Sequence, residues 1–289
     1  MCGLVGYSGN FQKDDLISGV AKLNHRGPDD NGIFIDNKND VGLGHTRLSI
    51  QDLSALGHQP MLSEDGNIAL VFNGEIYNFK ELKKDLINKG YKFKSGSDTE
   101  VILNLYIDMG LEMLDKLNGI FAFAFYDLRT GEIFLARDRL GIKPLYYSNL
   151  EDGFIFASEI KALIDFLPDK KKVDLSSLNK YLSFLWCPGE GTPLENVKKL
   201  LPGEALLIHN GNIKEQWTWF KLPIFRNVKA SLSKNEAINK TKLLLNQAVN
   251  RQLISDVPVG AFLSGGLDSS SIVAMAKQQN PNMSHEVCR

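Results

Sequence analysis

The sequence has few cysteines, no excess of charge of either sign and no long apolar run. Its three cysteines, Cys2, Cys187 and Cys288, form a sparse and odd set, which argues against a disulfide framework and fits a reducing cytoplasm. Lys+Arg numbers 33 and Asp+Glu 34, so a net charge of -1 gives no basis for binding nucleic acid or an anionic membrane. No apolar run approaches the ~18 residues of a membrane helix, and the N-terminus lacks the pattern of a signal peptide. We therefore expect a cytoplasmic protein without nucleic-acid or membrane partners.

Composition and length are those of an ordinary globular protein. Apolar residues make up 43% and charged residues 23% of the chain, a balance that does not favour disorder. At roughly 100–200 residues per domain, 289 residues correspond to one large domain or two ordinary ones.

Short apolar strands and amphipathic helices alternate over the first part of the chain. Strands are expected at residues 3–8, 68–72, 120–126, 132–136 and 153–157. The strand at 120–126 is apolar on both faces, so both faces are expected to be covered. A turn is expected at Asn73-Gly74, and a capping box of Ser97 and Glu100 is expected to open a helix. The pattern indicates a layered α+β domain.

The pattern changes after Asn210. Residues 214–233 have no clear period and are interpreted as a linker that lies against a neighbouring surface. A capping box of Ser233 and Glu236 is expected to open a long helix. Its buried stripe would consist of Ala237, Thr241, Leu244, Leu245 and Ala248. A strand at 257–263, a glycine-rich loop and a helix at 269–278 follow, and 278–289 is expected to be a loop leading to a further strand. One such unit cannot cover both faces of a parallel sheet, so this second domain is expected to be incomplete.

Cys2 is the first residue that indicates chemistry. Removal of the initiator methionine would make it N-terminal, and its free α-amine, with a reference pKa of ~8, would sit beside its own thiol. Such an amine can act as general base for a nucleophile on the same residue. The alternative is an incidental small residue after Met1.

Other residues supply what an amino-acid substrate requires. Arg47, inside an apolar strand pattern, can hold an α-carboxylate. The Asn73 amide and the Gly74 backbone N–H can act as oxyanion donors, and carboxylates can hold an α-ammonium group. Each signal has a structural alternative: Asn-Gly is a common turn, and Asp98 could be a helix cap.

Six motifs in order extend this interpretation. They are MCG at 1–3, HRGPD at 25–29, RLSI at 47–50, NGEIYN at 73–78, SDTE at 97–100 and ARDRLGIKPLY at 136–146. Together they resemble the N-terminal glutaminase domain of glutamine-hydrolysing asparagine synthetases, which are class II, N-terminal-nucleophile amidotransferases. The resemblance runs from residue 1 to about residue 213 and resumes from the loop at 264–270 to the end of the chain. It implies a four-layer α/β/β/α glutaminase domain, with two stacked antiparallel sheets between helices.

The resemblance also implies roles for individual residues. Cys2 corresponds to the nucleophile, and Asn73 and Gly74 correspond to the oxyanion donors. Glutamine would be bound by the residues that match the family's pocket: Arg47, Leu48, Ser49, Ile50, Gln51, Asn73, Gly74, Glu75 and Asp98. Arg47 would hold the α-carboxylate, and Glu75 and Asp98 the α-amino group. The motifs at 25–29 and 137–143 are interpreted as mainly structural.

A second site is expected in the loop after residue 262. Its glycines and the following helix N-terminus suit a phosphate group, although the loop lacks the Walker A ending. It resembles the pyrophosphate loop of ATP pyrophosphatases, which implies ATP binding by Leu263, Ser264, Gly265, Gly266, Asp268 and Ser269. Asp268 is a candidate ligand for Mg²⁺. The alternative is an ordinary glycine-rich turn.

The resemblance implies a glutamine-dependent asparagine synthetase. Glutamine hydrolysis at Cys2 would supply ammonia to ATP-activated aspartate, giving asparagine, AMP and pyrophosphate. The expected domains are a glutaminase domain at 1–213, a linker at 214–233 and a partial α/β adenine-nucleotide α-hydrolase-like domain at 234–289. Partners would be glutamine, aspartate and ATP, and a homodimer is compatible with these expectations. The alternatives are glutaminase activity alone, another acceptor, or a glutamine-sensing module without catalysis.

Overall fold

A computed structural model describes residues 1–168, 172–224, 232–281 and 284–287. The chain divides into two units, Met1–Leu222 and Pro223–Arg289, and each is described by itself. Cys288 and part of the expected linker, 225–231, lie outside the described residues. Within the described chain, no helix is both long enough and apolar enough to cross a membrane.

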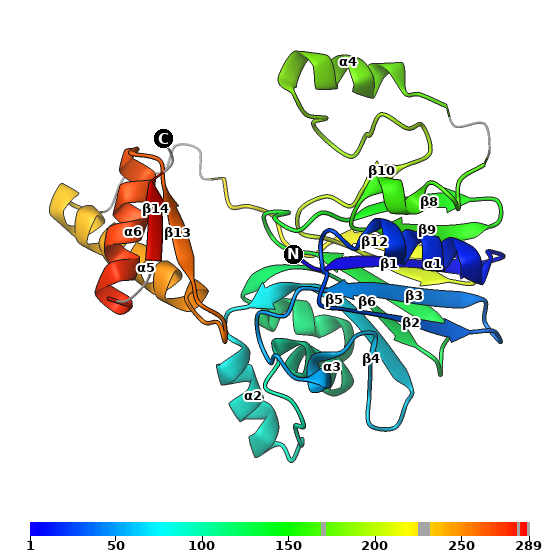
Figure 1. Cartoon of the computed structure of the whole chain (residues 1–289), viewed down its shortest axis with the longest axis horizontal. Helices are drawn as coiled ribbons and strands as arrows, with labels where there is room; N and C mark the ends of the chain where they lie inside the picture. Colours follow the sequence, from blue (N-terminus) through cyan, green and yellow to red (C-terminus); the bar gives the residue numbers. More distant parts are fainter. Residues whose placement is uncertain (169–171, 225–231, 282–283, 288–289) are drawn as a thin grey trace. The chain divides into compact units, whose positions relative to one another are not determined.

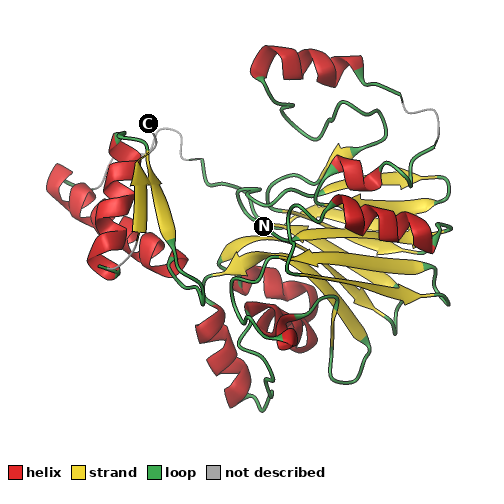
Figure 2. Cartoon of the chain, viewed as in Figure 1, coloured by secondary structure: helices red, strands yellow, loops and turns green. Residues whose placement is uncertain are grey.

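Two six-stranded antiparallel sheets form the centre of the first unit (Figures 1 and 2). The first sheet has the order β10-β8-β9-β1-β3-β2. Its strands are Lys198–Lys199, Tyr146–Leu150, Gly153–Ala157, Gly3–Gly9, Val41–Arg47 and Asp30–Asp36. The second sheet has the order β12-β11-β7-β6-β5-β4. Its strands are Asn212–Thr218, Glu204–His209, Glu132–Arg137, Gly119–Asp127, Ile68–Ile76 and Met61–Leu62.

Helices cover the outer faces of both sheets. The described helices of this unit are α1 (Lys13–Lys22), α2 (Phe79–Asn88), α3 (Asp98–Met109) and α4 (Leu175–Phe184), with 3-10 turns η1 (Ala55–Gly57), η2 (Gly110–Lys116) and η3 (Ile160–Leu163). Leu16 and Val20 of α1 pack with Val5 of the first sheet. Tyr106 of α3 stacks on Phe125 of the second sheet, with ring centroids 4.4 Å apart. These contacts confirm the four-layer α/β/β/α arrangement.

A fully apolar layer joins the two sheets. Leu4 and Phe156 from one sheet meet Val71, Ala122 and Ala124 from the other, and all five are buried. The alanine face of β6 therefore looks into the sheet interface, while the phenylalanine face meets α3. This confirms the prediction that the strand is covered on both sides.

The expected turn at Asn73-Gly74 is wrong, because β5 runs on to Ile76. Asn73 pairs with Ala122 and Gly74 with Phe121 in the ladder to β6. A Cβ on Gly74 would lie 2.4 Å from the carbonyl oxygen of Ile120. The glycine is therefore required by close backbone approach between strands, not by a turn.

The capping box expected at α3 forms only in part. The Ser97 hydroxyl accepts the N–H of Thr99, as an N-cap does. The carboxylate of Glu100 instead accepts the backbone N–H groups of Lys94 and Ser95. The N–H of Ser97 donates to the Ser95 hydroxyl. Glu100 thus fixes the loop before the helix instead of closing the box.

The expected linker begins too early, because β12 occupies residues 212–218. This edge strand pairs with β11. Trp217 stacks over Phe134 and Trp219 over Phe121, each with ring centroids 6.0 Å apart. The tryptophans do lie against a neighbouring surface, but as part of the sheet and the turn that follows it.

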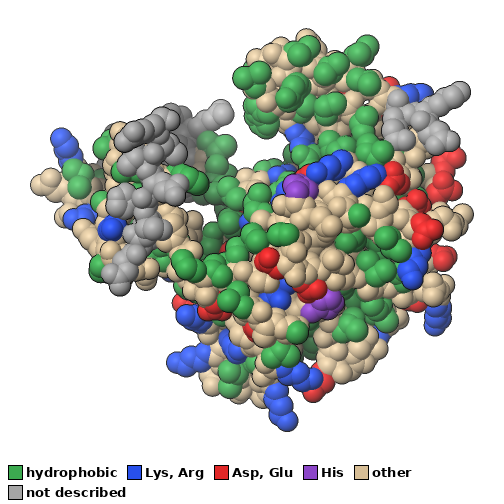
Figure 3. Space-filling view, viewed as in Figure 1, with side chains coloured by type: hydrophobic (Ala, Val, Ile, Leu, Met, Phe, Trp, Pro, Cys, Tyr) green, Lys and Arg blue, Asp and Glu red, His purple; other side chains and the backbone are tan. Residues whose placement is uncertain are grey.

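Helix α4 carries a group of exposed apolar side chains, visible in the space-filling view (Figure 3). Leu175, Leu182, Phe184 and Leu185 are all more than half exposed. The helix is capped by Asp174, whose carboxylate accepts the N–H of Ser176.

The second unit is a β-α-β arrangement preceded by a long helix. Helix α5 (Lys234–Gln252) opens with the predicted capping box of Ser233 and Glu236. Strand β13 (Gly260–Leu263) leads into α6 (Leu267–Gln279), and β14 (Ser284–Val287) pairs with β13 in parallel. The stretch after residue 278, expected as a loop, therefore includes a strand. Strand β13 is shorter than expected, because the Ser255 hydroxyl and the Val257 N–H form a turn before it.

The expected buried stripe of α5 is wrong. Thr241, Leu244 and Leu245 are exposed, whereas the neighbouring Val249 is buried against Ala276 of α6. Among the described residues of this unit, α6 is the helix against which α5 packs, and it covers only the C-terminal end of the stripe.

Candidate active site

Six segments of the first unit meet around one cavity of about 120 Å³. Its lining residues are Met1, Cys2, Arg47, Leu48, Ile50, Gln51, Gln59, Phe72, Asn73, Gly74, Glu75, Ser97, Asp98, Thr99 and Lys143. The cavity is smaller than the ~300–1,000 Å³ of pockets for drug-sized ligands, so it suits a molecule no larger than a single amino acid. Most of its walls come from strand ends and the first turn of α3, which are rigid elements.

Cys2 lies at the start of β1, and its thiol faces the loop after β3. Its Sγ accepts the N–H of Leu48 at 3.4 Å and lies 3.7 Å from the Leu48 carbonyl oxygen. Burial raises the pKa of the thiol, and the Leu48 N–H, the N-terminal amine and Lys143 act in the opposite direction. Burial also lowers the pKa of the Met1 amine. The cavity thus brings an amine of reduced basicity close to a buried thiol.

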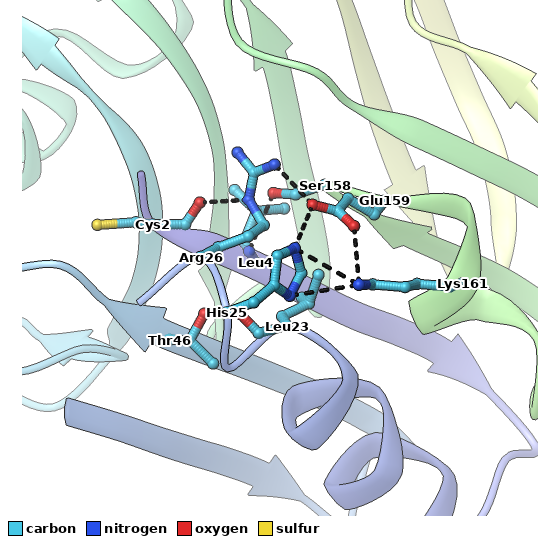
Figure 4. A network of polar contacts seen from close by, with 9 residues as sticks. All are labelled: Cys2, Leu4, Leu23, His25, Arg26, Thr46, Ser158, Glu159 and Lys161. Carbon is cyan, nitrogen blue, oxygen red and sulfur yellow. Dashed lines mark hydrogen bonds and ion pairs between the residues drawn. The ribbon is translucent and has the colours of Figure 1, made fainter. Parts of the chain in front are cut away.

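A polar network fixes the backbone of Cys2 (Figure 4). Arg26 donates from Nε to the Cys2 carbonyl oxygen and from Nη1 to Glu159, both at 2.8 Å. Glu159 also meets His25 at 2.9 Å and Lys161 at 3.3 Å. The motif at 25–29 therefore positions the N-terminal strand, as its structural interpretation predicts.

Arg47 is the last residue of β3, and its side chain is buried. Its Nη1 donates to the Ser54 carbonyl at 2.9 Å, and its Nη2 donates to the carbonyls of Gln51 and Asp52. The guanidinium group therefore ties down the loop that forms one wall of the cavity. These hydrogen-bond partners are neutral carbonyls, and the carboxylate of Asp52 lies close enough for Arg47 to lower its pKa. Since the guanidinium group also lines the cavity, it can attract an anion there.

Gly57→Ala is expected to weaken binding of glutamine, the substrate that the resemblance implies, without unfolding the protein. A Cβ at position 57 would lie 1.9 Å from Nη2 of Arg47. The guanidinium group would have to move, and a displaced charged hydrogen bond costs about 1.5–3 kcal/mol. We expect KM for glutamine to rise about 10–100-fold in steady-state assays. Gly96→Ala is the matched control, because its Cβ would lie 3.7 Å from the nearest atom; equal KM values for both variants would contradict the prediction.

Asn73 presents an unused donor inside the fold. The residue is 1% exposed, and its Nδ2 has no hydrogen-bond partner among the residues that the structure describes. A buried donor without an acceptor is destabilising, and such groups concentrate at functional sites. Because Asn73 lines the cavity, a ligand oxygen there could accept from it.

Glu75 and Asp98 place one half-buried and one fully buried carboxyl group in the wall of the cavity. Asp98 accepts the N–H of Ile76 at 2.8 Å, and Glu75 accepts from the side-chain amide of Gln51. Burial raises the pKa of both groups, and the charge of Asp98 raises the pKa of Glu75 further. Two such carboxyls favour a cation between them, because a positive charge would allow both to ionise.

The structure brings most of the predicted glutamine-binding residues to the cavity, but not all of them. Leu48, Ile50 and Gln51 line it, whereas Ser49 does not. The N–H of Ser49 donates to the carboxylate of Asp29 at 2.7 Å.

Six cavity residues were not among the predicted site residues: Met1, Gln59, Phe72, Ser97, Thr99 and Lys143. Gln59 accepts the N–H of Phe72 at 2.6 Å and has no motif that marks it. Lys143 belongs to the motif at 136–146, which was interpreted as structural. That interpretation holds for Asp138, whose carboxylate accepts the N–H groups of Phe121, Leu140, Ile142 and Lys143.

The glycine-rich loop of the second unit joins β13 to α6. Gly265 has φ +80°, Gly266 is the N-cap of α6, and Asp268 lies in its first turn. The hydroxyls of Ser264 and Ser269 are 3.0 Å apart. Exposed helix N–H groups, two hydroxyls and one carboxylate suit a phosphate with its cation. No group of three or more acidic, His or Cys side chains that could hold a metal occurs among the described residues.

Comparison with known proteins agrees with this geometry. Residues 1–219 match the family model described as a glutamine amidotransferase domain. The chain belongs to the glutamine amidotransferase family. Residues 240–287 match the family model described as asparagine synthase.

Curated relatives of this amidotransferase are named as glutamine-hydrolysing asparagine synthetases. It is 40% identical to asparagine synthetase [glutamine-hydrolyzing] 1 of Bacillus subtilis, over 98% of this chain and 45% of that protein. It is 36% identical to asparagine synthetase [glutamine-hydrolyzing] 3 of the same species, over 96% of this chain and 45% of that protein. The chain therefore spans about half the length of these curated relatives.

A solved structure shares the fold. Glutamine phosphoribosylpyrophosphate amidotransferase from B. subtilis superposes with a TM-score of 0.58 at 20% identity, covering 99% of this chain and 65% of that one. This likeness supports the fold of the amidotransferase unit, in which two antiparallel sheets are stacked between helices.

Proposed function

We propose that this chain hydrolyses glutamine at Cys2 and that the ammonia serves the synthesis of asparagine. One observation carries the proposal. A single cavity of amino-acid size is lined by a thiol, a buried guanidinium group, an amide donor without a partner among the described residues, and the carboxyls of Glu75 and Asp98. These are the groups that bind a zwitterionic amino acid and attack its side-chain amide.

In the proposed reaction, glutamine lies with its α-carboxylate on Arg47 and its α-ammonium group between Glu75 and Asp98. The backbone at Leu48, Ile50 and Gln51 lines the remaining wall, and Ser49 contributes through the same loop. The ammonium group would relieve the repulsion between the two carboxyls. Binding and orientation of this kind supply much of the rate enhancement in two-reactant steps.

Cys2 then attacks the side-chain amide carbon of glutamine. The S–C bond forms, and the oxyanion accepts from Asn73 Nδ2 and the Gly74 N–H. The thiol proton passes to an α-amine and then to the leaving nitrogen, so that ammonia departs as the C–N bond breaks. Water hydrolyses the thioester to glutamate. The base in this scheme is the α-amine of Cys2, which is free only after Met1 has been removed.

The second unit is proposed to belong to the site that uses the ammonia. ATP would lie with its nucleoside beside Leu263 and its phosphates on Ser264, Gly265, Gly266 and Ser269, with Asp268 as a ligand for Mg²⁺. ATP supplies the activation of aspartate, with release of pyrophosphate, and ammonia displaces AMP to give asparagine. The match of residues 240–287 and the names of the relatives support this part. These substrates and the sparse cysteines favour the cytoplasm.

An amide-transfer assay tests the proposal on the purified chain. Glutamine, aspartate, ATP and Mg²⁺ are supplied, and glutamate, asparagine and pyrophosphate are quantified. Glutamate release supports the Cys2 site, and asparagine with equimolar pyrophosphate supports the synthetase part. Glutamate without asparagine would limit this chain to the glutaminase reaction or point to another acceptor. No glutamate would contradict the proposal and favour a glutamine-sensing module.

A further inference from the structure

Lys143 is a buried lysine in the wall of the glutaminase cavity. Its backbone is fixed at both ends, since its N–H donates to Asp138 at 2.9 Å and its carbonyl accepts from Arg137 at 2.7 Å. Its side chain is only 8% exposed. Lys143 lines the same cavity as Cys2 and Glu75. The loop therefore delivers a positive charge to a fixed place beside the thiol.

The ammonium group of Lys143 makes no polar contact that would stabilise the fold within the described residues. Within the described residues it has neither a hydrogen bond nor an ion pair. Burial lowers the pKa of Lys143, and the charges of Glu75 and Cys2 partly offset that effect. A buried, unpaired charge is destabilising, whereas an apolar side chain of similar length would fill the same space. The positive charge of Lys143 is therefore expected to act on groups that line the cavity.

Charged groups from several elements face this position. Negative groups are Glu75 from β5, Asp98 from α3 and Asp138 from the loop after β7, and positive groups are Arg26, Arg47 and the N-terminal amine. Arg26 is paired with Glu159, and Arg47 is bound to loop carbonyls. Lys143 differs from these three cations. It is not the chain terminus, and within the described residues its ammonium group is not bound to a carboxylate or a carbonyl.

We propose that Lys143 is a positioning residue whose ammonium group favours the thiolate form of Cys2 and the carboxylate form of Glu75. This proposal rests on the function proposed above. The thiolate is the attacking species, so a cation beside it offsets the effect of burial and of the negative charge of Glu75. Ionised Glu75 is the form that receives an α-ammonium group. Both effects depend on charge and not on the shape of the side chain.

The test measures the reactivity of the Cys2 thiol directly. Alkylation of Cys2 by iodoacetamide is followed as a function of pH, through the mass of the N-terminal peptide, in Lys143→Met, Lys143→Gln and Lys143→Arg. Lys214→Met is the matched control, because this exposed lysine pairs only with Glu132 on the sheet edge. An opposite charge nearby shifts a pKa by about one unit or more. We expect both neutral variants to react about tenfold more slowly below the thiol pKa, with Lys143→Arg and Lys214→Met following the wild type.

The outcomes separate this proposal from the glutaminase proposal. The acid limb of kcat/KM for glutamine should move to higher pH in the neutral variants, in step with the alkylation curve. Unchanged alkylation curves in Lys143→Met and Lys143→Gln, with glutamate release intact, would overturn the role of Lys143 alone. A Lys143→Arg curve that matches the neutral variants would also overturn it, because charge would then not be the cause. A wild-type chain that alkylates at Cys2 but releases no glutamate would instead contradict the glutaminase proposal.

Discussion

Replacing Cys2 with alanine is expected to lower the rate of glutamate release by at least about three orders of magnitude. Among the residues that the structure describes, no other thiol lines the cavity, and removing a nucleophile from a covalent mechanism eliminates the acyl-enzyme pathway. Glutamine binding should persist, because Arg47, Glu75 and Asp98 are untouched. The measurement is kcat for glutamate formation together with the Kd for glutamine by calorimetry.

Cys187 provides the control for this change. Its thiol lies outside the cavity and contacts the Ser177 carbonyl. Cys187→Ala should keep kcat within about twofold, since few contacts are lost at a site remote from the reacting atoms. A Cys2→Ala chain that still hydrolyses glutamine at the wild-type rate would exclude Cys2 as the nucleophile.

Replacing Asn73 with alanine should reduce kcat about 10²–10³-fold while leaving stability nearly unchanged. The magnitude is that of losing one oxyanion donor. Stability should hold because Asn73 Nδ2 makes no hydrogen bond among the described residues, so its removal eliminates an unsatisfied donor. The change is measured as kcat for glutamate release and as the midpoint of urea unfolding.

The variant Asn73→Asp tests the same role of Asn73 as an oxyanion donor. Aspartate preserves the shape of the side chain but accepts where asparagine donates, so it should be as inactive as alanine. Near-normal kcat in either variant would show that Asn73 does not stabilise the oxyanion. A large loss of stability in Asn73→Ala would show instead that the amide has a structural partner.

A layered α+β domain could be predicted because its strands carry strong local patterns, whereas the four-layer order was implied by the resemblance. The alternation of phenylalanine and alanine over 120–126 identifies a strand covered on both faces, and β6 is such a strand. The motif at 73–78 was predicted to start with a turn, because Asn-Gly favours turns in isolation. Pairing of β5 with β6 overrides that local preference, since each ladder position adds hydrogen bonds and burial that no turn supplies.

The site could be predicted only where residue type already indicates chemistry. Cys2, Arg47 and Asn73 come together as expected, because their types in that order carry the resemblance. Lys143 could not be recognised from the sequence, because its neighbours in the same motif are structural. Only the folded loop, which Asp138 holds to Phe121 of β6, shows that Lys143 and not Arg139 of the same motif lines the cavity.

In the second unit, the sequence predicted a helix but not which of its side chains are buried. Helical spacing correctly predicted α5 and its capping box, but it could not show which partner covers the apolar stripe. Burial depends on neighbouring elements, and Leu244 is 54% exposed in the described unit. Spacing therefore identifies the face of a helix suited to packing, without showing that the face is buried.

The central claim is that Cys2 is an N-terminal nucleophile that forms a thioester with glutamine. The most direct measurement is the mass of the N-terminal peptic peptide from protein quenched in acid during glutamine turnover. We predict a peptide that begins at Cys2, with a fraction carrying a γ-glutamyl group on the thiol. An unmodified peptide that begins at Met1, from protein releasing glutamate at full rate, would contradict the claim.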